Sequence, residues 1–564
     1  MESLFYDITI IVSLAAFLAI IFRLIKQPPI LAYILAGIII SKIGLASAGT
    51  AETIHTLSDI GIVLLLFMLG LELKIDDLKS VGKVAIIAGI GQIIFTSFFG
   101  YLLSFTLGFN PIASLYIAIA LTFSSTIIIV KLLSDKKHLK SLYGRISVGF
   151  LLVQDFVAIF ALIILSGFNT VDGYSISLFD FLFVLLKGLL IFALVIYLSK
   201  SFFPAVFRKI PHSSETLFLF SLAWAFAISY LVSSPLIGFS IEIGGFLAGI
   251  AIANSAESFQ IVAKIKSLRD FFITIFFVNL GATLTFGNIA GIWLPALIFS
   301  LFVLIGNPLI VLIIMGLLGY KKRTSFLAGL TVAQISEFSL IIIVLGNKIG
   351  HLPDEVVSLI TIVGVLTFTL STYMILNGNT LYRKLSNYLS VFERKKSKNK
   401  ELVTTKDGID SVENHVILVG IDQMGESILE ALEEIGRDVV VIDFDLKALG
   451  KLSEKRAHGL YGDIADLEIQ QKAKIDSASL VISTIPELQD NLTLLKELQQ
   501  ENRKAKIVAM ALDAKDARAL YKAGADYVVL PYLIGGKQIA KILAGDNFLE
   551  ELGELKEKDK KYLS

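Results

Sequence analysis

Long apolar runs separated by short polar loops dominate the first two thirds of the chain. Each run has about 17 to 25 residues, the length that a helix needs to cross the hydrocarbon core of a bilayer. Thirteen such runs are found, with approximate spans 4–22, 29–46, 55–72, 84–107, 111–132, 147–167, 178–199, 214–232, 235–254, 270–285, 290–317, 325–346 and 356–377. The pattern predicts a polytopic α-helical membrane protein with about thirteen transmembrane helices.

Basic residues are unevenly distributed among the connecting loops. The loops after the odd-numbered runs, from the first to the eleventh, hold 19 Lys and Arg residues, and the other six loops hold two, Lys42 and Lys348. Because short cytoplasmic loops carry an excess of Lys and Arg, we expect an outside N-terminus and a cytoplasmic C-terminus. The opening segment MESLFYDITI lacks a basic region and a small-residue cleavage site, so it is interpreted as a retained helix.

A different pattern begins at His415, where short β-rich runs alternate with helical segments. Strands are expected in HVILVG, DVVVIDFD, LVISTI, KIVAM and YVVLP, with helices between them. This alternation predicts a parallel, doubly wound sheet. We therefore expect a transmembrane domain at 1–380, a basic juxtamembrane linker at 381–413, a Rossmann-like α/β domain at 414–545 and a charged C-terminal tail at 546–564.

Composition supports the membrane assignment and excludes several kinds of site. The 564 residues are 55% hydrophobic and 18% charged, and the absence of cysteine excludes disulfides, thiolate metal sites and cysteine nucleophiles. The formal net charge of +1 combines 29 basic and 19 acidic residues in 1–400 with 21 basic and 30 acidic residues in 401–564. Opposite charges on the two parts favour their docking in a salt-sensitive manner. The basic run at 394–400 is interpreted as a contact for anionic lipids rather than nucleic acid.

Few charged side chains lie inside the apolar runs, where a charge is costly and usually faces a cavity or pathway. Asp155 is the clearest case, near the middle of the sixth run and next to Gln154. Desolvation favours the neutral form of a carboxyl group and a nearby cation favours its charged form, so a proton and a cation would compete for Asp155. A structural aspartate bonded to a neighbouring helix is the alternative.

Two runs carry polar interruptions at comparable depth, at 122–126 in the fifth run and at 333–338 in the twelfth. One interruption in each half is typical of the crossed, broken helices of an inverted-repeat transporter, whose unwound carbonyls could ligate a cation. In the alternative, an intact helix, hydroxyl groups bond back to the preceding turn.

The remaining candidates follow from these interruptions. The candidate ion-binding residues beside Asp155 are Gln154, Ser124, Ser125, Thr126 and Glu337, and Glu337 is also expected to close or neutralise the crossing. For Glu242 and Asn279, an interhelical hydrogen bond and a substrate contact are both open. Glu72 lies at a helix end and is not expected to be a ligand.

The soluble part contains an incomplete dinucleotide motif. Gly420-Ile421-Asp422-Gln423-Met424-Gly425 follows a predicted strand and opens a predicted helix, but it has only the first and third glycines of the fingerprint. Asp422 places a side chain and an adverse charge where a pyrophosphate would approach. Asp443, at the end of the second strand, could accept a hydrogen bond from a ribose hydroxyl. AMP therefore fits better than NAD(H), and a scaffold that binds no nucleotide is the alternative.

These motifs together resemble the monovalent cation:proton antiporter-2 family, in particular its Kef-type branch of glutathione-gated potassium-efflux proteins with a C-terminal regulatory nucleotide-binding domain. The resemblance extends from Gln27 to about Pro531. It rests on QPPILAY (27–33), LGLEL (69–73), Ser124-Ser125, Gln154-Asp155, GGFLAGIAIANS (244–255), FFVNLG (276–281) and AQISEF (333–338).

The resemblance implies a dimer in which a mobile core half moves against a dimerisation half, with Asp155 as the ion-binding carboxylate. Electrogenic relatives have two adjacent aspartates where this chain has Gln154 and Asp155, so we expect electroneutral exchange. Asp463 and Ser483 match the regulatory-domain pattern and complete the nucleotide candidates. Kef-type proteins carry arginine at the position of Gln423, which puts glutathione gating in doubt.

We therefore expect an antiporter, not an enzyme, that exchanges K⁺ in preference to Na⁺ for protons in a bacterial or archaeal inner membrane. Its expected partners are a second copy of the chain, a regulatory nucleotide and membrane lipids, without nucleic acid. A ligand-gated potassium channel or efflux system is the alternative, although no TVGYG-like filter occurs. A membrane-bound oxidoreductase is disfavoured because little chain follows the last strand.

Overall fold

The computed structural model divides the chain into two compact units, Met1–Glu393 and Arg394–Ser564. The residues that it describes are 2–43, 51–72, 83–136, 138–139, 141–166, 186–188, 190–191, 193–195, 197–199, 214–234, 237–255, 257–284, 289–392, 413–443, 446–450, 452, 457–462, 464, 467–486, 488–501, 504–545 and 548–563.

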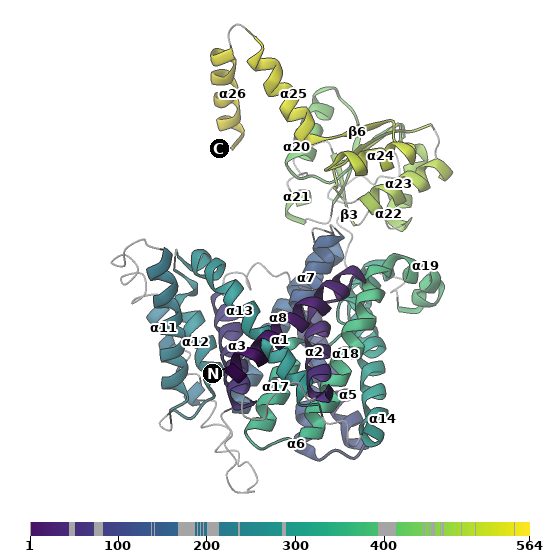
Figure 1. Cartoon of the computed structure of the whole chain (residues 1–564). Coiled ribbons are helices and arrows are strands. Elements are labelled where there is room, and N and C mark those ends of the chain that lie inside the picture. Colours follow the sequence, from purple (N-terminus) through teal and green to yellow (C-terminus); the bar gives the residue numbers. More distant parts are fainter. Residues whose placement is uncertain are drawn as a thin grey trace. The chain divides into compact units, whose positions relative to one another are not determined.

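The first unit is a bundle of helices (Figure 1). Its helices are α1 (Glu2–Leu24), α2 (Pro29–Ile43), α3 (Ala51–Glu72), α5 (Lys83–Thr106), α6 (Pro111–Thr122), α7 (Thr126–Asp135), α8 (Leu142–Ser166), α11 (Ser214–Val232), α12 (Ile241–Ala253), α13 (Ser258–Ala282), α14 (Ile289–Leu301), α15 (Asn307–Leu317), α16 (Lys322–Leu330), α17 (Glu337–Lys348), α18 (Asp354–Leu376) and α19 (Gly378–Leu389). A π-helical turn, Phe302–Gly306, joins α14 to α15.

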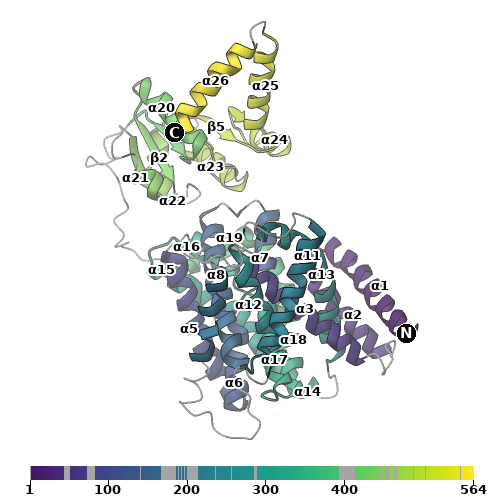
Figure 2. The ribbon, with the colours of Figure 1, turned by 90° about the vertical axis from the view of Figure 1, so that its left-hand side faces the viewer.

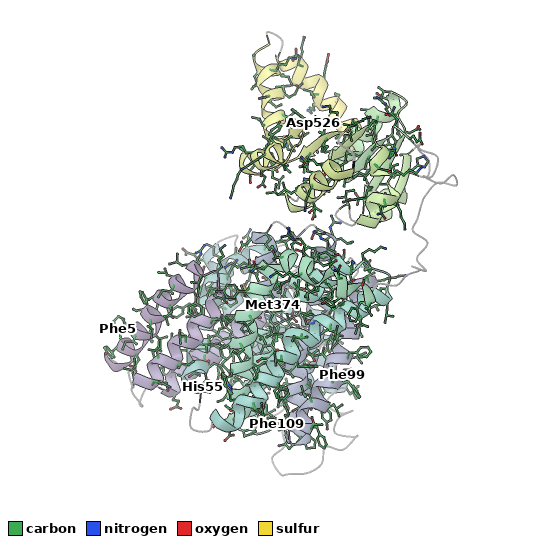
Figure 3. All side chains as sticks on the ribbon, turned by 90° about the vertical axis from the view of Figure 1, so that its right-hand side faces the viewer. Phe5, His55, Phe99, Phe109, Met374 and Asp526 are labelled. Atoms are coloured by element: carbon green, nitrogen blue, oxygen red, sulfur yellow. The ribbon has the colours of Figure 1, made fainter. Side chains whose placement is uncertain are left out.

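Within the described residues, eight spans are long and apolar enough to cross a membrane. Shorter apolar helices include α2 and α12. Most of the seventh predicted run, 178–199, lies outside the described residues, so the total of thirteen helices stays a prediction. Large apolar side chains cover the periphery of the bundle: Phe5 is 77% exposed and Phe99 is 44% exposed, and they lie at opposite edges in Figure 3. Such a surface suits lipid rather than water.

The helices form two groups that pack mainly within themselves. The scaffold group contains α1, α2, α3, α11, α12 and α13. The core group contains α5 to α8 and α14 to α18. Glycines allow very close packing in the scaffold group: a Cβ atom added at Gly249 of α12 would lie 2.1 Å from the Phe67 carbonyl oxygen of α3.

Both predicted interruptions are real breaks in the core group. The first separates α6 from α7 by Phe123–Ser125, where Phe123 and Ser125 have extended backbone conformations. The second separates α16, which ends at Leu330, from α17, which begins at Glu337. The alternative of intact helices is therefore excluded for both runs.

The tenth predicted run, 270–285, was too short. Helix α13 begins at Ser258. Its first turns carry Lys264, Lys266 and Arg269, so they are helical but were not part of the apolar run. An apolar run measures the part of a helix that suits lipid, not the whole helix.

The second unit contains a six-stranded parallel sheet with the order β3-β2-β1-β4-β5-β6. Its strands are β1 (Val416–Val419), β2 (Val439–Asp443), β3 (Ala457–Tyr461), β4 (Leu480–Ser483), β5 (Lys506–Met510) and β6 (Tyr527–Val529). The predicted doubly wound, Rossmann-like domain is confirmed. Strand β3 was missed because AHGLY contains a histidine and a glycine and lacks a run of β-branched residues.

Helices cover both faces of this sheet, as parallel sheets require. They are α20 (Gln423–Glu434), α21 (Leu446–Gly450), α22 (Leu467–Lys472), α23 (Leu488–Glu501) and α24 (Ala514–Lys522). Alternate residues of β1 serve opposite cores: Ile417 and Val419 belong to one, and Val416 and Leu418 belong to the other. Two further helices, α25 (Pro531–Leu543) and α26 (Phe548–Leu563), form a hairpin after the last strand (Figure 2). Helix α26 occupies the predicted charged tail.

Candidate functional site

The break between α6 and α7 lies directly beside Asp155. Asp155 is 4% exposed on α8, and the Thr126 hydroxyl donates a hydrogen bond to its Oδ2 at 2.8 Å. Thr126 is the first residue of α7, so the break determines where this hydroxyl lies. The structure thus brings two predicted site residues into direct contact.

Glu337 joins the two broken helices. The Ser125 hydroxyl, which accepts from the Ile128 N–H and caps α7, donates to Glu337 Oε1 at 2.8 Å. Ser336 caps α17 and donates to Glu337 Oε2 at 3.4 Å. The carboxylate therefore lies at the N-terminal ends of two half-helices, where the helix dipoles stabilise negative charge.

Ser124, the other serine of the pair, makes a different link between the two breaks. Ser124 donates from its hydroxyl to the Val332 carbonyl at 3.4 Å, within the turn that connects α16 to α17. Ser124 and Ser125 are both fully buried. The Ser124 hydroxyl thus contacts the turn before α17, and the Ser125 hydroxyl contacts Glu337, the first residue of α17.

Gln154 uses both ends of its amide on protein partners. Its Oε1 accepts from the Ser124 N–H at 3.0 Å, and its Nε2 donates to Gln92 Oε1 at 2.6 Å. Gln154 is 0% exposed. The structure therefore places this predicted site residue against the unwound backbone.

Polar residues of α5 and α15 that the sequence reasoning missed also surround the break. Gln92 and Thr96 lie on α5, and Asn307 begins α15. Each is at most 1% exposed. Their only signal in the sequence is that each is a hydrogen-bonding side chain inside an apolar run.

Three carboxylates and one arginine near the crossing are connected by pairwise electrostatic interactions. Asp155 interacts with Glu337 and Glu72, and Arg269 interacts with Glu72 and Glu337. Arg269 belongs to the scaffold group, has a side chain that is 12% exposed, and donates to Asp270 at 2.7 Å. Glu72, which was not expected to be a ligand, therefore contributes to the field at Asp155.

A cavity of about 320 Å³ lies between helices of both groups. Its polar lining comes from α3, α13, α17 and α18 and consists of His55, Ser58, Asp59, Asn279, Thr283, Asn347 and Asp354. His55 is labelled in Figure 3. In the predicted orientation these helix ends face the outside.

An ion pair next to this lining connects the two groups. Lys348 of α17 lies 2.8 Å from Asp59 Oδ2 of α3 and 3.5 Å from Glu242 Oε1 of α12. Glu242 thus makes an interhelical ion pair, and Asn279 lines the cavity.

The backbone of the predicted nucleotide loop is bonded by Asp443, at the end of β2, and by Thr484, directly after β4. Gly420 has a φ of 89°, which favours glycine, and the following Ile421 N–H donates to Asp443 Oδ2 at 2.7 Å. Thr484 donates to the Gly420 carbonyl at 3.0 Å. A Cβ atom at Gly425 would lie 2.1 Å from the Gly420 carbonyl oxygen, so this glycine permits α20 to approach the strand.

The other nucleotide candidates are placed differently. Asp422 is exposed at the N-cap of α20 and makes no side-chain cap hydrogen bond. Ser483 is 1% exposed and donates to Asn491 Oδ1 at 2.6 Å, so the structure does not bring its hydroxyl to the loop. Its neighbour Thr484 reaches the loop instead. Asp463 lies outside the described residues.

Comparison with known families identifies both units. Residues 11–377 match the model of the sodium/hydrogen exchanger, transmembrane, family, and residues 416–531 match the TrkA-N domain. The first match covers more than half of the chain. The chain belongs to the sodium/hydrogen exchanger family of transmembrane proteins, and the predicted combination of exchanger and regulatory domain is confirmed.

Individual relatives agree with this membership. The chain is 26% identical over 541 residues to the putative cation/proton antiporter YbaL of Escherichia coli, covering 94% of each chain. It is 30% identical to K(+) efflux antiporter 5 of Arabidopsis thaliana, covering 60% of each. A solved structure of a Shewanella denitrificans Kef C-terminal domain in AMP-bound form is 21% identical and covers 26% of this chain and 92% of its own, with a TM-score of 0.22.

Proposed function

We propose that the protein is a monovalent cation/proton antiporter that works by alternating access and carries K⁺ in preference to Na⁺. The observation that carries the proposal is a buried carboxylate, Asp155, held against the crossing of two broken helices in a member of the exchanger family. Unwound backbone inside a bundle is typical of transporter binding sites. The preference for K⁺ is supported by the potassium-efflux relatives.

One carboxylate serves both ions in turn. Ionised Asp155 binds the cation with help from the hydroxyl groups at the break, Ser124, Ser125 and Thr126, and protonated Asp155 releases it. Glu337 neutralises the facing helix ends. Gln154 adds no charge beside Asp155, so one cation exchanges for one proton without net charge movement.

Asp155→Asn tests the exchange. We expect the variant to abolish cation-dependent proton flux in everted vesicles. The amide of asparagine does not take up a proton at the pH of the assay, and it carries no negative charge to bind a cation. Asp135→Asn, at the exposed end of α7, is the matched control and should retain wild-type flux. Trials with K⁺ and Na⁺ in turn identify the ion.

Exchange at wild-type rates by Asp155→Asn, with the dimer intact, would contradict the assignment. A current that scales with transport in proteoliposomes under voltage clamp would contradict electroneutral exchange alone.

The second unit is proposed to regulate exchange by binding a nucleotide, AMP in preference to NAD(H). The loop geometry supports one phosphate rather than two, because Asp422 and Asp443 place negative charge around Gly420. The functional division is proposed at 1–380, 381–413, 414–545 and 546–564. We further propose a homodimer in a bacterial or archaeal inner membrane, with the N-terminus outside and the regulatory unit in the cytoplasm.

A further inference from the structure

A chain of hydrogen bonds begins at the unwound backbone after α6. The Ser124 N–H donates to Gln154 Oε1 at 3.0 Å, and Gln154 Nε2 donates to Gln92 Oε1 at 2.6 Å. Gln92 Nε2 then donates to the Thr122 carbonyl at 3.0 Å. Side chains from α8 and α5 thus connect the end of α6 to the unwound segment.

The same chain continues to α15. Gln92 Nε2 also donates to the Thr96 hydroxyl at 3.0 Å, and Thr96 donates to Asn307 Oδ1 at 3.0 Å. Asn307 Nδ2 donates to the Leu121 carbonyl at 3.1 Å. The chain therefore starts at a backbone N–H and ends at backbone carbonyls of the same broken helix.

The two backbone ends give the chain one direction. A backbone N–H can only donate and a carbonyl can only accept, so the Ser124 N–H requires the oxygen of Gln154 to face it. The amides of Gln92 and Asn307 then have the same orientation, because each accepts through its oxygen and donates through its nitrogen. None of Gln92, Thr96, Gln154 and Asn307 is more than 1% exposed, so water does not offer alternative partners.

The chain also supplies partners for backbone atoms at the end of α6. Polar backbone in the membrane interior needs partners, and here the carbonyls of Leu121 and Thr122 receive theirs from Asn307 and Gln92. Each of these two oxygens thus has a side-chain donor in the structure. Beyond the break, the Thr126 hydroxyl bonds the carboxylate of the ion site.

We propose that Gln92, Thr96 and Asn307 are positioning residues of the ion site. They fix the end of α6, and with Gln154 they fix the unwound segment, so that Thr126 is held at hydrogen-bond distance from Asp155. The proposal rests on the proposed exchange. Their hydrogen bonds go to one another, to Gln154 and to backbone carbonyls of α6, so they act on Asp155 through the backbone of the break.

Gln92→Met and Thr96→Val cut the chain while nearly preserving side-chain volume. We expect each variant to raise the cation concentration for half-maximal exchange, by about tenfold or more for Gln92→Met, and to shift the pH profile of exchange. Ser104→Ala is the matched control: it lies on the same helix, is 0% exposed, and its hydroxyl has no hydrogen-bond partner among the described residues. It should change neither quantity.

Two further readouts separate positioning from stability. Thr96→Val and Asn307→Leu should be non-additive in their effect on half-saturation, because both cut the same link. If Gln92→Met does not fold, Thr96→Val decides alone. A folded Thr96→Val protein with wild-type half-saturation and pH profile overturns the proposal.

The exchange proposal is tested separately by the wild type and Ser104→Ala. Absence of cation-dependent proton flux in both overturns exchange itself. Flux in both, with an unshifted half-saturation in the folded chain variants, overturns only the positioning role.

Discussion

Asp422 stands where the fingerprint of a dinucleotide site has the glycine that lets phosphate approach the backbone. Its side chain is exposed at the start of α20 and does not cap that helix. The N-terminus of a helix normally attracts phosphate. Here an added carboxylate works against that attraction, more strongly for two or three phosphates than for one.

Isothermal titration of the isolated 401–564 fragment with AMP, ATP, NADH and glutathione tests this residue. We expect heat with AMP in the wild type and a gain of about tenfold or more in affinity for ATP and NADH in Asp422→Gly, from removal of one nearby negative charge. Asp438→Gly, at the opposite end of β2, is the control and should leave binding unchanged. No heat with any ligand in any variant would favour a scaffold that binds no nucleotide.

Residues with a costly charge or a polar cluster could be predicted, and single polar residues could not. Asp155, Thr126, Ser125 and Glu337 were predicted as one site, and the structure brings them into two hydrogen-bonded pairs. Gln92 has no such signal, because one amide in an apolar run looks the same whether it bonds its own helix or another. The side to which such a residue points depends on tertiary packing.

Neighbouring residues at a strand end illustrate a second limit. Ser483 was the predicted candidate, but its neighbour Thr484 reaches the Gly420 turn, while Ser483 bonds Asn491. Successive side chains along an extended chain point to opposite faces of the sheet. The sequence alone did not show which of the two side chains points toward the Gly420 turn.

At the scale of elements, hydropathy predicted the segments that lie in lipid, and polar residues at mid-depth predicted the breaks. The gaps between α6 and α7, at 123–125, and between α16 and α17, at 331–336, overlap the predicted interruptions. The start of α13 and the whole of β3 were not predicted, because a charged helical turn and a short strand with glycine lack the periodicity on which such predictions depend.

Packing of α3 against α12 depends on backbone contact. At Gly249 a Cβ atom would lie 2.1 Å from the Phe67 oxygen, and rigid backbone atoms cannot move aside without separating the helices. We expect Gly249→Ala to destabilise the protein by about 1–3 kcal/mol, measured as a lower thermal unfolding temperature in detergent. Gly91→Ala is the control, because its Cβ atom would meet the flexible end of Ile314 at 3.0 Å. Equal unfolding temperatures for the two variants would contradict this account of the helix pair.

At the scale of the whole molecule, the hydropathy and strand patterns predicted two domains and their classes, and both are confirmed by the family matches. The division of the membrane unit into scaffold and core groups was not visible in hydropathy, because all of these helices are apolar. It depends on long-range contacts between helices far apart in the chain. Lys348, counted in the sequence only as a rare basic residue in an outside loop, connects the groups.

A cross-link between the groups tests alternating access. The chain has no cysteine, so Asp59→Cys with Lys348→Cys introduces a unique thiol pair, and a bifunctional methanethiosulfonate reagent spans the length of the lysine side chain. We expect cross-linking to stop exchange and a reductant to restore it, because the core group has to move against the scaffold group.

The matched control for this cross-link lies within one group at the same end of the bundle. Asn347 of α17 donates to Asp354 of α18 at 2.9 Å, and both helices belong to the core group. Cross-linking Asn347→Cys with Asp354→Cys should leave exchange intact. Unchanged exchange after complete 59–348 cross-linking would show that the groups do not separate there.

In the proposed nucleotide site, the Asp443 carboxylate already accepts from the Ile421 N–H and so would compete with a bound nucleotide. A nucleotide that uses this N–H has to displace the Asp443 carboxylate, whose charge must then be met by water, a ribose hydroxyl or a basic group. A phosphate alone repels that carboxylate, whereas a ribose hydroxyl gives it a new partner. Under the proposed function, this exchange of partners sets the ligand concentration at which the unit responds, and molecules that offer phosphate without ribose would bind more weakly than AMP.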